Sequence, residues 1–301
     1  PGVMDRIGLS SAVLRKINPQ LIYVAVSGFG TQGPMADFPA FDHVIQGMAG
    51  FTDLQAPDDN RFDFIRTFIC DKVTAYTVAQ AATAALLARA TTGEGQHIDI
   101  SMLHACIAFM WPDGMMHKTL KDDDRFEMSP GADYFQTLNF SDGAVAVAAL
   151  TDSHWQAVLP LIGYPELLET PLFSSIASRM SNMKEVGKVL KNPRLDIGVE
   201  KAVAALKAAD VPCAPCLHQN EIEANEQIQA IDALETYVTK AMGKLTVPRP
   251  PVQFDGATTS QAKPSPLLGE HSRQVLSELG WDNSAIDQLV SMGNVVITPL
   301  P

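Results

Sequence analysis

The carboxylate of Asp71 has a setting in which it could do chemistry. It follows the apolar stretch 67–70 and opens an Ala-rich segment, residues 71–90, whose apolar residues predict a well-buried helix. At the start of a helix an aspartate usually serves as the N-cap, which is a structural role. Backbone N–H groups and the helix dipole would equally keep the carboxylate ionised in an apolar pocket, available as a nucleophile. The residues alone leave both roles open.

A glycine-rich segment, GFGTQG at residues 28–33, matches the G-x-G-x-x-G fingerprint of dinucleotide-binding sites. In such sites the third glycine opens a helix whose N-terminus holds a pyrophosphate, but here Pro34 and Pro39 follow closely. We therefore expect a glycine loop at the carboxyl end of a strand, not a nicotinamide or flavin site. Loops at this place commonly line ligand sites in open α/β sheets.

The pair Cys213 and Cys216 forms a C-x-x-C motif with His218 close behind, which could bind zinc or carry a redox dithiol. The other cysteines, Cys70 and Cys106, lie in separate apolar segments and make no second pair at ligand spacing. A redox motif would also need a strand before it and a helix opening at it. We interpret the motif as a chance pairing in a loop and predict no metal site.

Composition and charge exclude several classes of protein. The formal net charge is −12, whereas nucleic-acid binding needs clustered Lys and Arg that neutralise phosphates. No apolar run approaches the roughly 18 residues that a membrane-spanning helix needs. Four cysteines in 301 residues are too few for a disulfide framework. We expect a cytoplasmic enzyme that binds neither nucleic acid nor membrane.

Alternating strand-like and helical segments must position these residues. A buried strand is predicted over 21–26, a second strand over 97–100, and helices over 71–90 and 101–110, which together indicate an α/β layer with parallel strands. Beyond a charged stretch the pattern becomes α+β, with a predicted hairpin and helices. These later elements are strands 134–138 and 144–150, helices 152–161 and 198–209, a Pro-rich connector at 247–252, and helices 271–279 and 284–292.

Three parts of the chain follow from this pattern. Residues 1–122 are predicted to form a large α/β domain that contains Asp71. Residues 123–245 form a smaller α+β domain, and residues 246–301 a connector with helices that return to the large domain.

Six short segments lie in order along nearly the whole chain: PGVMDRIGL at 1–9, NPQLIY at 18–23, SGFG at 27–30, TGEGQ at 92–96, VPCAP at 211–215 and LGEH at 268–271. Together they resemble the class III CoA-transferase family, which includes formyl-CoA and carnitine CoA-transferases and shares its fold with α-methylacyl-CoA racemases. The resemblance implies a Rossmann-like large domain and an interlocked homodimer in which each chain threads through the other.

By this resemblance Asp71 is the catalytic residue, because the family's aspartate stands at the start of the helix before the Thr-Gly-x-Gly-Gln turn. It would attack the thioester of an acyl-CoA, and an aspartyl-CoA thioester would then pass CoA to an acceptor carboxylic acid. Coenzyme A is thus expected as part of the substrate. Arg6 matches a position that contacts the nucleotide phosphates of CoA, a task for which a guanidinium is suited.

Further positions match family residues that bind CoA or substrate: Gly28, Phe41, Asp42, Met102 and Gly131. Racemases of this fold carry a histidine where Phe41 stands, and His43 lies two positions away. This difference favours a transferase over a racemase. The stretch SPGA at 129–132 stands where formate and oxalate enzymes carry a glycine run, so a formyl and oxalyl specificity is not expected.

Family members carry roughly a further quarter of chain before the Pro-Gly-x-x-Asp-Arg segment, with the first βα units of the Rossmann-like half. We expect that this N-terminal part is missing from the sequence. The predicted function is a CoA-transferase; the alternatives are an α-methylacyl-CoA racemase or a non-catalytic CoA-binding fragment.

Overall fold

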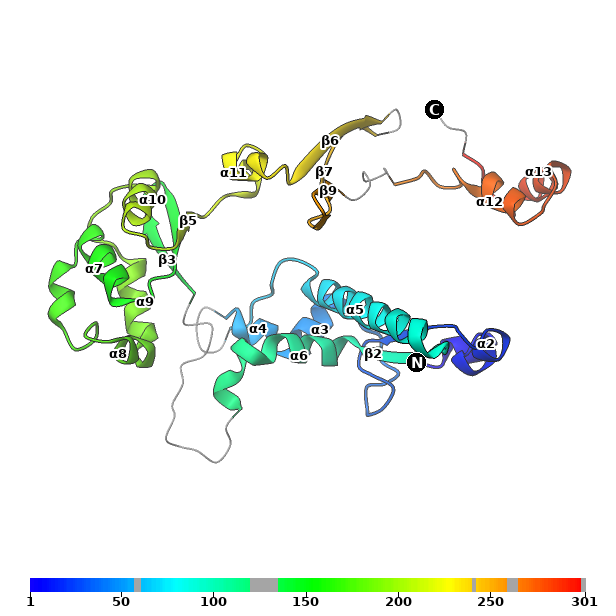
Figure 1. Ribbon diagram of the computed structural model, residues 1–301, viewed down its shortest axis with the longest axis horizontal. Coiled ribbons are helices and arrows are strands. Elements are labelled where there is room, and N and C mark those ends of the chain that lie inside the picture. The colour runs from blue at the N-terminus through cyan, green and yellow to red at the C-terminus, as the bar shows by residue number, and fades with distance from the viewer. Residues whose placement is uncertain (57–60, 120–134, 240–241, 259–264, 299–301) are drawn as a thin grey trace. The chain divides into compact units, whose positions relative to one another are not determined.

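The computed structural model describes residues 1–56, 61–119, 135–239, 242–258 and 265–298, which group into two compact units, 1–216 and 217–301 (Figure 1). The first unit opens with an α/β layer. Its elements are α1 (Val3–Arg6), α2 (Ser11–Ile17), β1 (Tyr23–Ser27), α3 (Asp42–Ala49), α4 (Phe51–Leu54), α5 (Ile69–Thr92), β2 (His97–Ser101), α6 (Met102–Gly114) and the 3-10 helix η1 (Met116–Lys118).

The strands β1 and β2 pair in parallel, with Tyr23 opposite His97 and Ser27 opposite Ser101. Parallel strands require a crossover, which the helices between them supply, so that both carboxyl ends lie at one edge. The predicted parallel α/β layer is confirmed. The prediction that the first strand is buried on both faces is wrong, because Val26 is 50% exposed.

Helices α3, α5 and α6 pack against one another around a shared apolar core (Figure 1). The fully or nearly buried members of this core are Ile45, Ala49, Phe51, Cys70, Val73, Cys106 and Met110. The long helix α5 ends where Gly93 adopts a left-handed φ of 74°, which a residue without a Cβ tolerates. The core therefore holds the first turns of α5 and α6 side by side.

The turn after α5 is tied to the segment before β1. Gly95 donates its N–H to the Pro19 carbonyl at 2.9 Å, and its own carbonyl accepts from Nη2 of Arg15 at 2.9 Å. A Cβ at Gly95 would stand 2.1 Å from the Leu21 oxygen, so only glycine fits there. This close approach explains the TGEGQ sequence and sets where β2 begins beside β1.

Residues 135–216 form an α+β region, as predicted. Its elements are β3 (Gln136–Phe140), β4 (Gly143–Val147), α7 (Asp152–Leu161), the 3-10 helix η3 (Pro165–Glu169), α8 (Ile176–Ser181), α9 (Met183–Lys191), α10 (Val199–Ala208) and β5 (Cys213–Pro215). The antiparallel sheet has the order β3-β4-β5. The predicted hairpin is present, with a turn of only Ser141 and Asp142, because both strands extend into the predicted turn cluster.

The Cys213–Cys216 motif lies on the sheet of this region. Cys213 and Pro215 pair with β4, and no helix begins at the motif. The Cys213 thiol is half-buried and contacts the Val203 carbonyl at 3.9 Å, whereas Cys216 is exposed. This placement differs from the strand-then-helix arrangement of a redox dithiol.

The second unit, 217–301, consists of short elements. They are the 3-10 helix η4 (Gln219–Glu221), α11 (Glu226–Ala230), β6 (Leu234–Thr239), β7 (Gly243–Pro248), β8 (Gln253–Phe254), β9 (Ala257–Thr258), α12 (Ser272–Glu278) and α13 (Asn283–Ser291). Strands β6 and β7 form a hairpin, and β7 ends at Pro248, where the predicted Pro-rich connector continues. Ile286 is the one buried apolar side chain in the described part of this unit.

None of the helices in the described ranges combines the length and the apolar character needed to cross a membrane.

Candidate functional site

Asp71 lies in the first turn of α5, and its side chain is exposed. The helix begins at Ile69, and its N-cap is Phe68, which has no side chain able to accept a hydrogen bond. The interpretation of Asp71 as the N-cap is therefore wrong by three residues. Its carboxylate does not close the helix end and is presented to solvent.

A second carboxylate closes this helix end in place of an N-cap. Asp42, the first residue of α3, is only 3% exposed, and its Oδ2 accepts the backbone N–H of Asp71 at 3.0 Å. The first N–H groups of a helix lack partners within the helix, and a carboxylate satisfies one of them well. Asp42 thus caps α5 from another helix and leaves the Asp71 side chain free.

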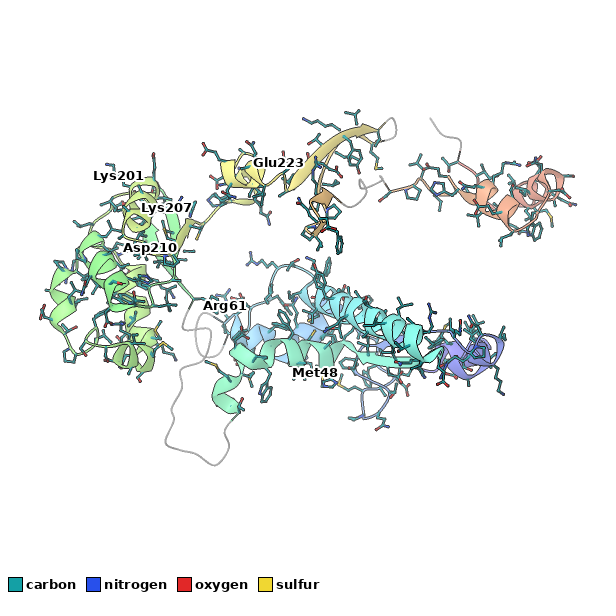
Figure 2. The ribbon with its side chains drawn as sticks, in the orientation of Figure 1. Met48, Arg61, Lys201, Lys207, Asp210 and Glu223 are labelled. Carbon is teal, nitrogen blue, oxygen red and sulfur yellow. The ribbon has the colours of Figure 1, made fainter. Side chains whose placement is uncertain are left out.

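The segment that leads into α5, residues 61–68, has no regular structure. Arg61, labelled in Figure 2, opens it and places its Nε 3.7 Å from Oδ1 of Asp63. Closer to α5, the backbone of Ile65 and Thr67 is hydrogen-bonded by the side chain of Gln46 from α3. This side chain also bonds to the Asp42 carboxylate. Gln46 was not among the predicted site residues, although two polar residues four apart on an apolar helix face could have indicated it.

The glycine loop after β1 reaches the same place. The Gly28 carbonyl accepts the Leu103 N–H at 3.0 Å, which ties the end of β1 to the first turn of α6. A Cβ at Gly28 would stand 2.2 Å from the Cβ of Ala40, the residue before Phe41. Only glycine permits this approach, and residues 34–41 follow Gly33 as turns and extended chain, so no helix opens at the third glycine. The predicted glycine loop is confirmed.

Met102 is the first residue of α6 and is half-buried against the core that α3, α5 and α6 share. Ser101 caps this helix by accepting the His104 N–H at 3.3 Å. The ends of β1 and β2 and the first turns of α3, α5 and α6 therefore converge. Of the predicted site residues, the structure brings together Gly28, Phe41, Asp42, Asp71 and Met102.

The ring of Phe41 is 69% exposed and precedes the buried Asp42. It stacks parallel to the imidazole of His43, with ring centroids 6.3 Å apart, and His43 meets Phe64 edge to face at 6.5 Å. Phe41 carries no titratable group. Its ring forms an exposed apolar surface at the N-terminus of α3.

Two thiols lie directly beneath Asp71. Cys70 and Cys106 are fully buried, and Sγ of Cys106 lies 3.9 Å from the Cys70 carbonyl. The hydrogen bond with the Cys106 thiol, burial, and the negative charges of Asp42 and Asp71 all raise the pKa of the Cys70 thiol far above its ordinary value. The Cys70 thiol therefore stays protonated and does not compete with the Asp71 carboxylate as a nucleophile.

Two predicted residues stand apart from this cluster. Arg6 ends α1 and is exposed, and within the described part of the chain its guanidinium forms no ion pair. Gly131 lies outside the described residues.

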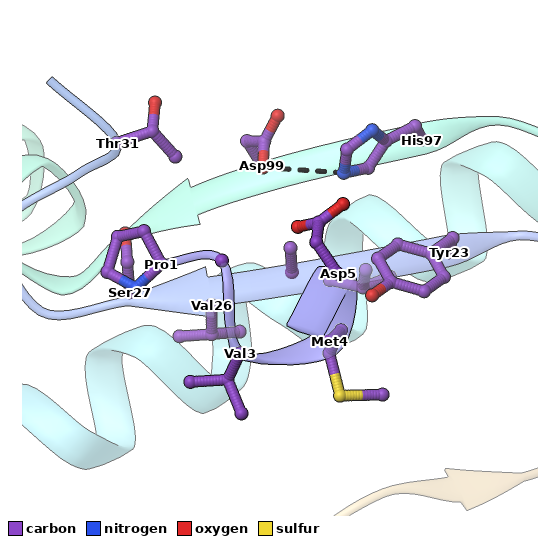
Figure 3. Close-up of a pocket in the computed structure, with 13 residues that line it drawn as sticks. Pro1, Val3, Met4, Asp5, Tyr23, Val26, Ser27, Thr31, His97 and Asp99 are labelled. Atoms are coloured by element: carbon purple, nitrogen blue, oxygen red, sulfur yellow. Dashed lines mark ion pairs between the residues drawn. The ribbon is translucent and has the colours of Figure 1, made fainter. Parts of the chain in front are cut away.

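A separate cavity of about 430 Å³ lies between residues 1–5 and the strands β1 and β2 (Figure 3). Its lining contains none of the clustered residues, and Nε2 of His97 lies 3.4 Å from Oδ1 of Asp99 within it. The lining residues are Pro1, Gly2, Val3, Met4, Asp5, Tyr23, Val24, Ala25, Val26, Ser27, Thr31, His97 and Asp99. The His97–Asp99 pair was not predicted, since its residues look like an ordinary strand.

The sequence of the chain matches a known protein family. The model of CoA-transferase family III matches residues 1–272. The chain belongs to CoA-transferase family III. It is therefore an enzyme of the class III CoA-transferase type, and such enzymes act on CoA thioesters.

Curated members of the family are similar along most of the chain. The acetyl-CoA:oxalate CoA-transferase of Acetobacter aceti is 31% identical over 291 residues, which cover 92% of this chain and 71% of that protein. The succinyl-CoA:glutarate CoA-transferase of Mus musculus is 27% identical over 300 residues, or 97% of this chain and 68% of that protein. The substrates in these two names are those of the relatives.

A solved structure supports the mixed α/β fold. The crystal structure of a CAIB/BAIF family protein from Brucella suis has a TM-score of 0.72 and 29% sequence identity, and the match covers 92% of this chain and 73% of that one. In the described ranges no three His, Cys, Asp or Glu side chains gather in a way that could hold a metal ion.

Proposed function

We propose that the protein moves CoA from an acyl-CoA thioester to a carboxylic acid and that Asp71 is the covalent nucleophile. The observation that carries the proposal is the pairing of two carboxylates at one helix end. Asp42 is buried and caps α5, and this leaves the Asp71 carboxylate exposed where β1, β2 and three helices converge. A nucleophilic aspartate needs such a free and ionised carboxylate.

The reaction balances with this one carboxylate. An oxygen of Asp71 attacks the thioester carbonyl, and the C–S bond breaks. CoA departs as the thiolate, and an acyl-aspartyl anhydride remains on the enzyme. The thiolate attacks the Asp71 carbonyl of the anhydride and releases the donor acid, which gives an aspartyl-CoA thioester. The acceptor carboxylate then repeats both steps in reverse and frees Asp71. The positive end of the α5 dipole favours the negative charge that develops at each attack.

The other predicted site residues have matching tasks in this proposal. The exposed Arg6, which has no ion pair in the described ranges, would bind the CoA phosphates. Gly28 lets the glycine loop approach Ala40 closely, and Phe41 and Met102 would line the acyl and acceptor pocket. Asp42 supports the nucleophile from beneath.

Phe41 argues against α-proton exchange. A racemase needs an acid–base group on each face of the α-carbon, and a phenyl ring can neither donate nor accept a proton. The substrates that the relatives' names contain are short-chain: acetyl-CoA and oxalate in one, succinyl-CoA and glutarate in the other. A small dicarboxylic acid is accordingly the acceptor class that we propose.

An interlocked homodimer is part of the same proposal. The second unit has one buried apolar side chain among its described residues, and several large apolar side chains in it are exposed: Val238, Phe254, Leu268 and Leu279. Such surface is costly in water and is typical of a chain that is covered on assembly. All four cysteines are free, which supports a cytoplasmic location.

The test is chemical trapping of the acyl enzyme. The native chain and Asp71→Asn are incubated with acetyl-CoA or succinyl-CoA and hydroxylamine, and the peptides are analysed by mass spectrometry. We expect a hydroxamate on Asp71 in the native chain and none in the variant, with both chains folded by circular dichroism. A folded, dimeric native chain that gives no adduct with either thioester, while binding CoA, would instead indicate a non-catalytic CoA-binding protein.

A further inference from the structure

We infer that Gln46 is a positioning residue for the reaction: with Asp42 it holds the backbone of residues 65–71 and so sets where the Asp71 carboxylate stands. The inference rests on the proposed nucleophilic role of Asp71. It concerns a residue that touches neither Asp71 nor, at 2% exposure, any substrate. Its effect must therefore pass through the backbone that it holds.

The Gln46 amide forms a two-way bridge to the segment before α5. Its Oε1 accepts the Ile65 N–H at 3.0 Å, and its Nε2 donates to the Ile65 carbonyl at 3.2 Å. Nε2 also lies 3.2 Å from the Thr67 carbonyl. Because the amide offers both a donor and an acceptor, it pairs with this backbone as a neighbouring strand would. The irregular segment thereby gains the partners that a sheet would supply.

Asp42 connects this bridge to the nucleophile. Its Oδ1 accepts from Nε2 of Gln46 at 2.6 Å, and its Oδ2 accepts the Asp71 N–H at 3.0 Å. Both carboxylate oxygens thus have internal partners in a site that is 3% exposed. This occupancy favours a positioning role for Asp42 over direct contact with substrate. The path from the Ile65 backbone to the Asp71 backbone runs through two side chains of one helix.

The segment needs this support because little else holds it. Phe62, Phe64 and Phe68 are exposed, and the apolar side chain of the segment that packs against the core of α3, α5 and α6 is the half-buried Ile65. Outside the first-turn bonds of α5, which reach the Thr67 and Phe68 carbonyls, the other bonds to the segment are the Asp63 N–H to the Thr52 carbonyl at 3.1 Å and Nζ of Lys72 to Oγ1 of Thr67 at 2.6 Å. The first lies at its far end, and the second is exposed and offers little restraint. The Gln46 amide is the buried side-chain restraint on residues 65–67, and Asp42 is the buried restraint on Asp71 itself.

The decisive variant is Gln46→Met, which keeps the length of the side chain and removes the amide. Rates of acyl-enzyme formation at Asp71 are measured by rapid quench with succinyl-CoA, and binding of CoA by calorimetry. We expect the rate of adduct formation to fall about 100-fold while the affinity for CoA stays within about twofold, because a misplaced nucleophile affects chemistry more than binding. An unchanged rate in a folded variant would overturn the inference.

Two controls separate positioning from stability. Gln55→Met makes the same substitution at an exposed residue after α4, and Ile45→Val trims a fully buried neighbour on α3 without touching a polar contact. Both should retain the native rate of adduct formation, measured well below the unfolding temperature of each variant. If Ile45→Val were as slow as Gln46→Met, loss of packing would explain the effect, and the inference would fail.

A second measurement keeps the inference testable if the proposed function fails. Hydrogen exchange on peptides that span residues 61–72 reports directly on the restraint. In Gln46→Met the amides of Ile65 and Asp71 should exchange at least about tenfold faster, whereas the rest of α5 keeps its protection. Unchanged exchange would overturn the inference. A native chain without any acyl adduct would refute only the proposed function.

Discussion

At the scale of residues, the site is defined by what each carboxylate and thiol can do in its own surroundings. Asp42 and Asp71 have the same chemistry, but Asp42 is buried with two internal donors, whereas the Asp71 side chain is exposed and receives no hydrogen bond from the described residues. Burial with hydrogen bonds commits the first to structure, and exposure leaves the second to react. The difference lies in the contacts, since both residues look alike in the sequence.

The raised pKa of the Cys70 thiol makes the stability of the protein sensitive to alkaline pH. The folded state holds Cys70 neutral because its pKa is raised, whereas the same thiol in the unfolded chain ionises above about pH 8.5. The native state then binds more protons than the unfolded state, so the free energy of unfolding falls as pH rises above that value. Below about pH 8.5 the Cys70 thiol makes its full contribution to the free energy of unfolding.

We expect this alkaline loss to be smaller in Cys70→Ala than in the native chain. Urea unfolding at about pH 7 and about pH 10 measures it, since the two values bracket the ordinary thiol pKa. Cys216→Ala, which changes an exposed thiol, should lose as much stability as the native chain. An equal pH dependence in all three chains would show that Cys70 ionises normally in the folded state.

At the scale of elements, the close contact between the glycine loop and the residue before α3 sets the geometry of the site. The Cβ atoms of an alanine at position 28 and of Ala40 would lie 2.2 Å apart, which neither backbone can accept without moving. Since α3 carries Asp42 and Gln46, a shift of residue 40 would also disturb the cap of α5.

Gly28→Ala should therefore lower the free energy of unfolding by about 1–3 kcal/mol and reduce the rate of adduct formation at Asp71. Adding Ala40→Gly to the same chain removes the opposing methyl group and should recover most of both losses. Gly47→Ala is the matched control, because nothing lies within 4 Å of its added Cβ and alanine favours a helix. A double variant as unstable as Gly28→Ala would contradict the contact. Urea unfolding measures all three.

At the scale of the whole molecule, the two units differ in how much apolar surface they bury. Residues 135–211 contain a core of buried side chains around Leu138, Trp155 and Val186, whereas 217–298 has only Ile286 among its described residues. A unit with so small a core is marginal by itself. The predicted boundaries near residues 122 and 245 stay predictions, as does the interlocked dimer.

Assembly is expected to supply the missing burial. Light scattering should give twice the chain mass for the native protein, and Val238→Asp with Leu279→Asp should shift it to one chain mass, because buried charges without partners are costly. Glu235 and Lys244 are left unchanged in all of these variants. The control is Lys188→Asp, an exposed change on α9 of the first unit. A native protein that stays monomeric at every concentration tested would refute the dimer.

Local residue patterns were sufficient to predict the class of the fold, several element boundaries and the family. Helix 152–161 is present with the predicted bounds, and the parallel strands lie within two residues of their predicted positions, because each depends on a local pattern of apolar residues. The order of six short segments was enough for the family, which the match over residues 1–272 confirms.

The construction of the candidate site depends on contacts between segments that are distant in the sequence. The start of α5 lies two residues before its predicted position because its cap comes from Asp42, which stands 29 residues earlier in the chain. Gln46 bonds to the Ile65 backbone 19 residues away, and Gly28 meets Ala40 across the loop. Contacts between side chains and distant backbone leave no periodic signal in a sequence. They form only once the core of α3, α5 and α6 has brought those segments together.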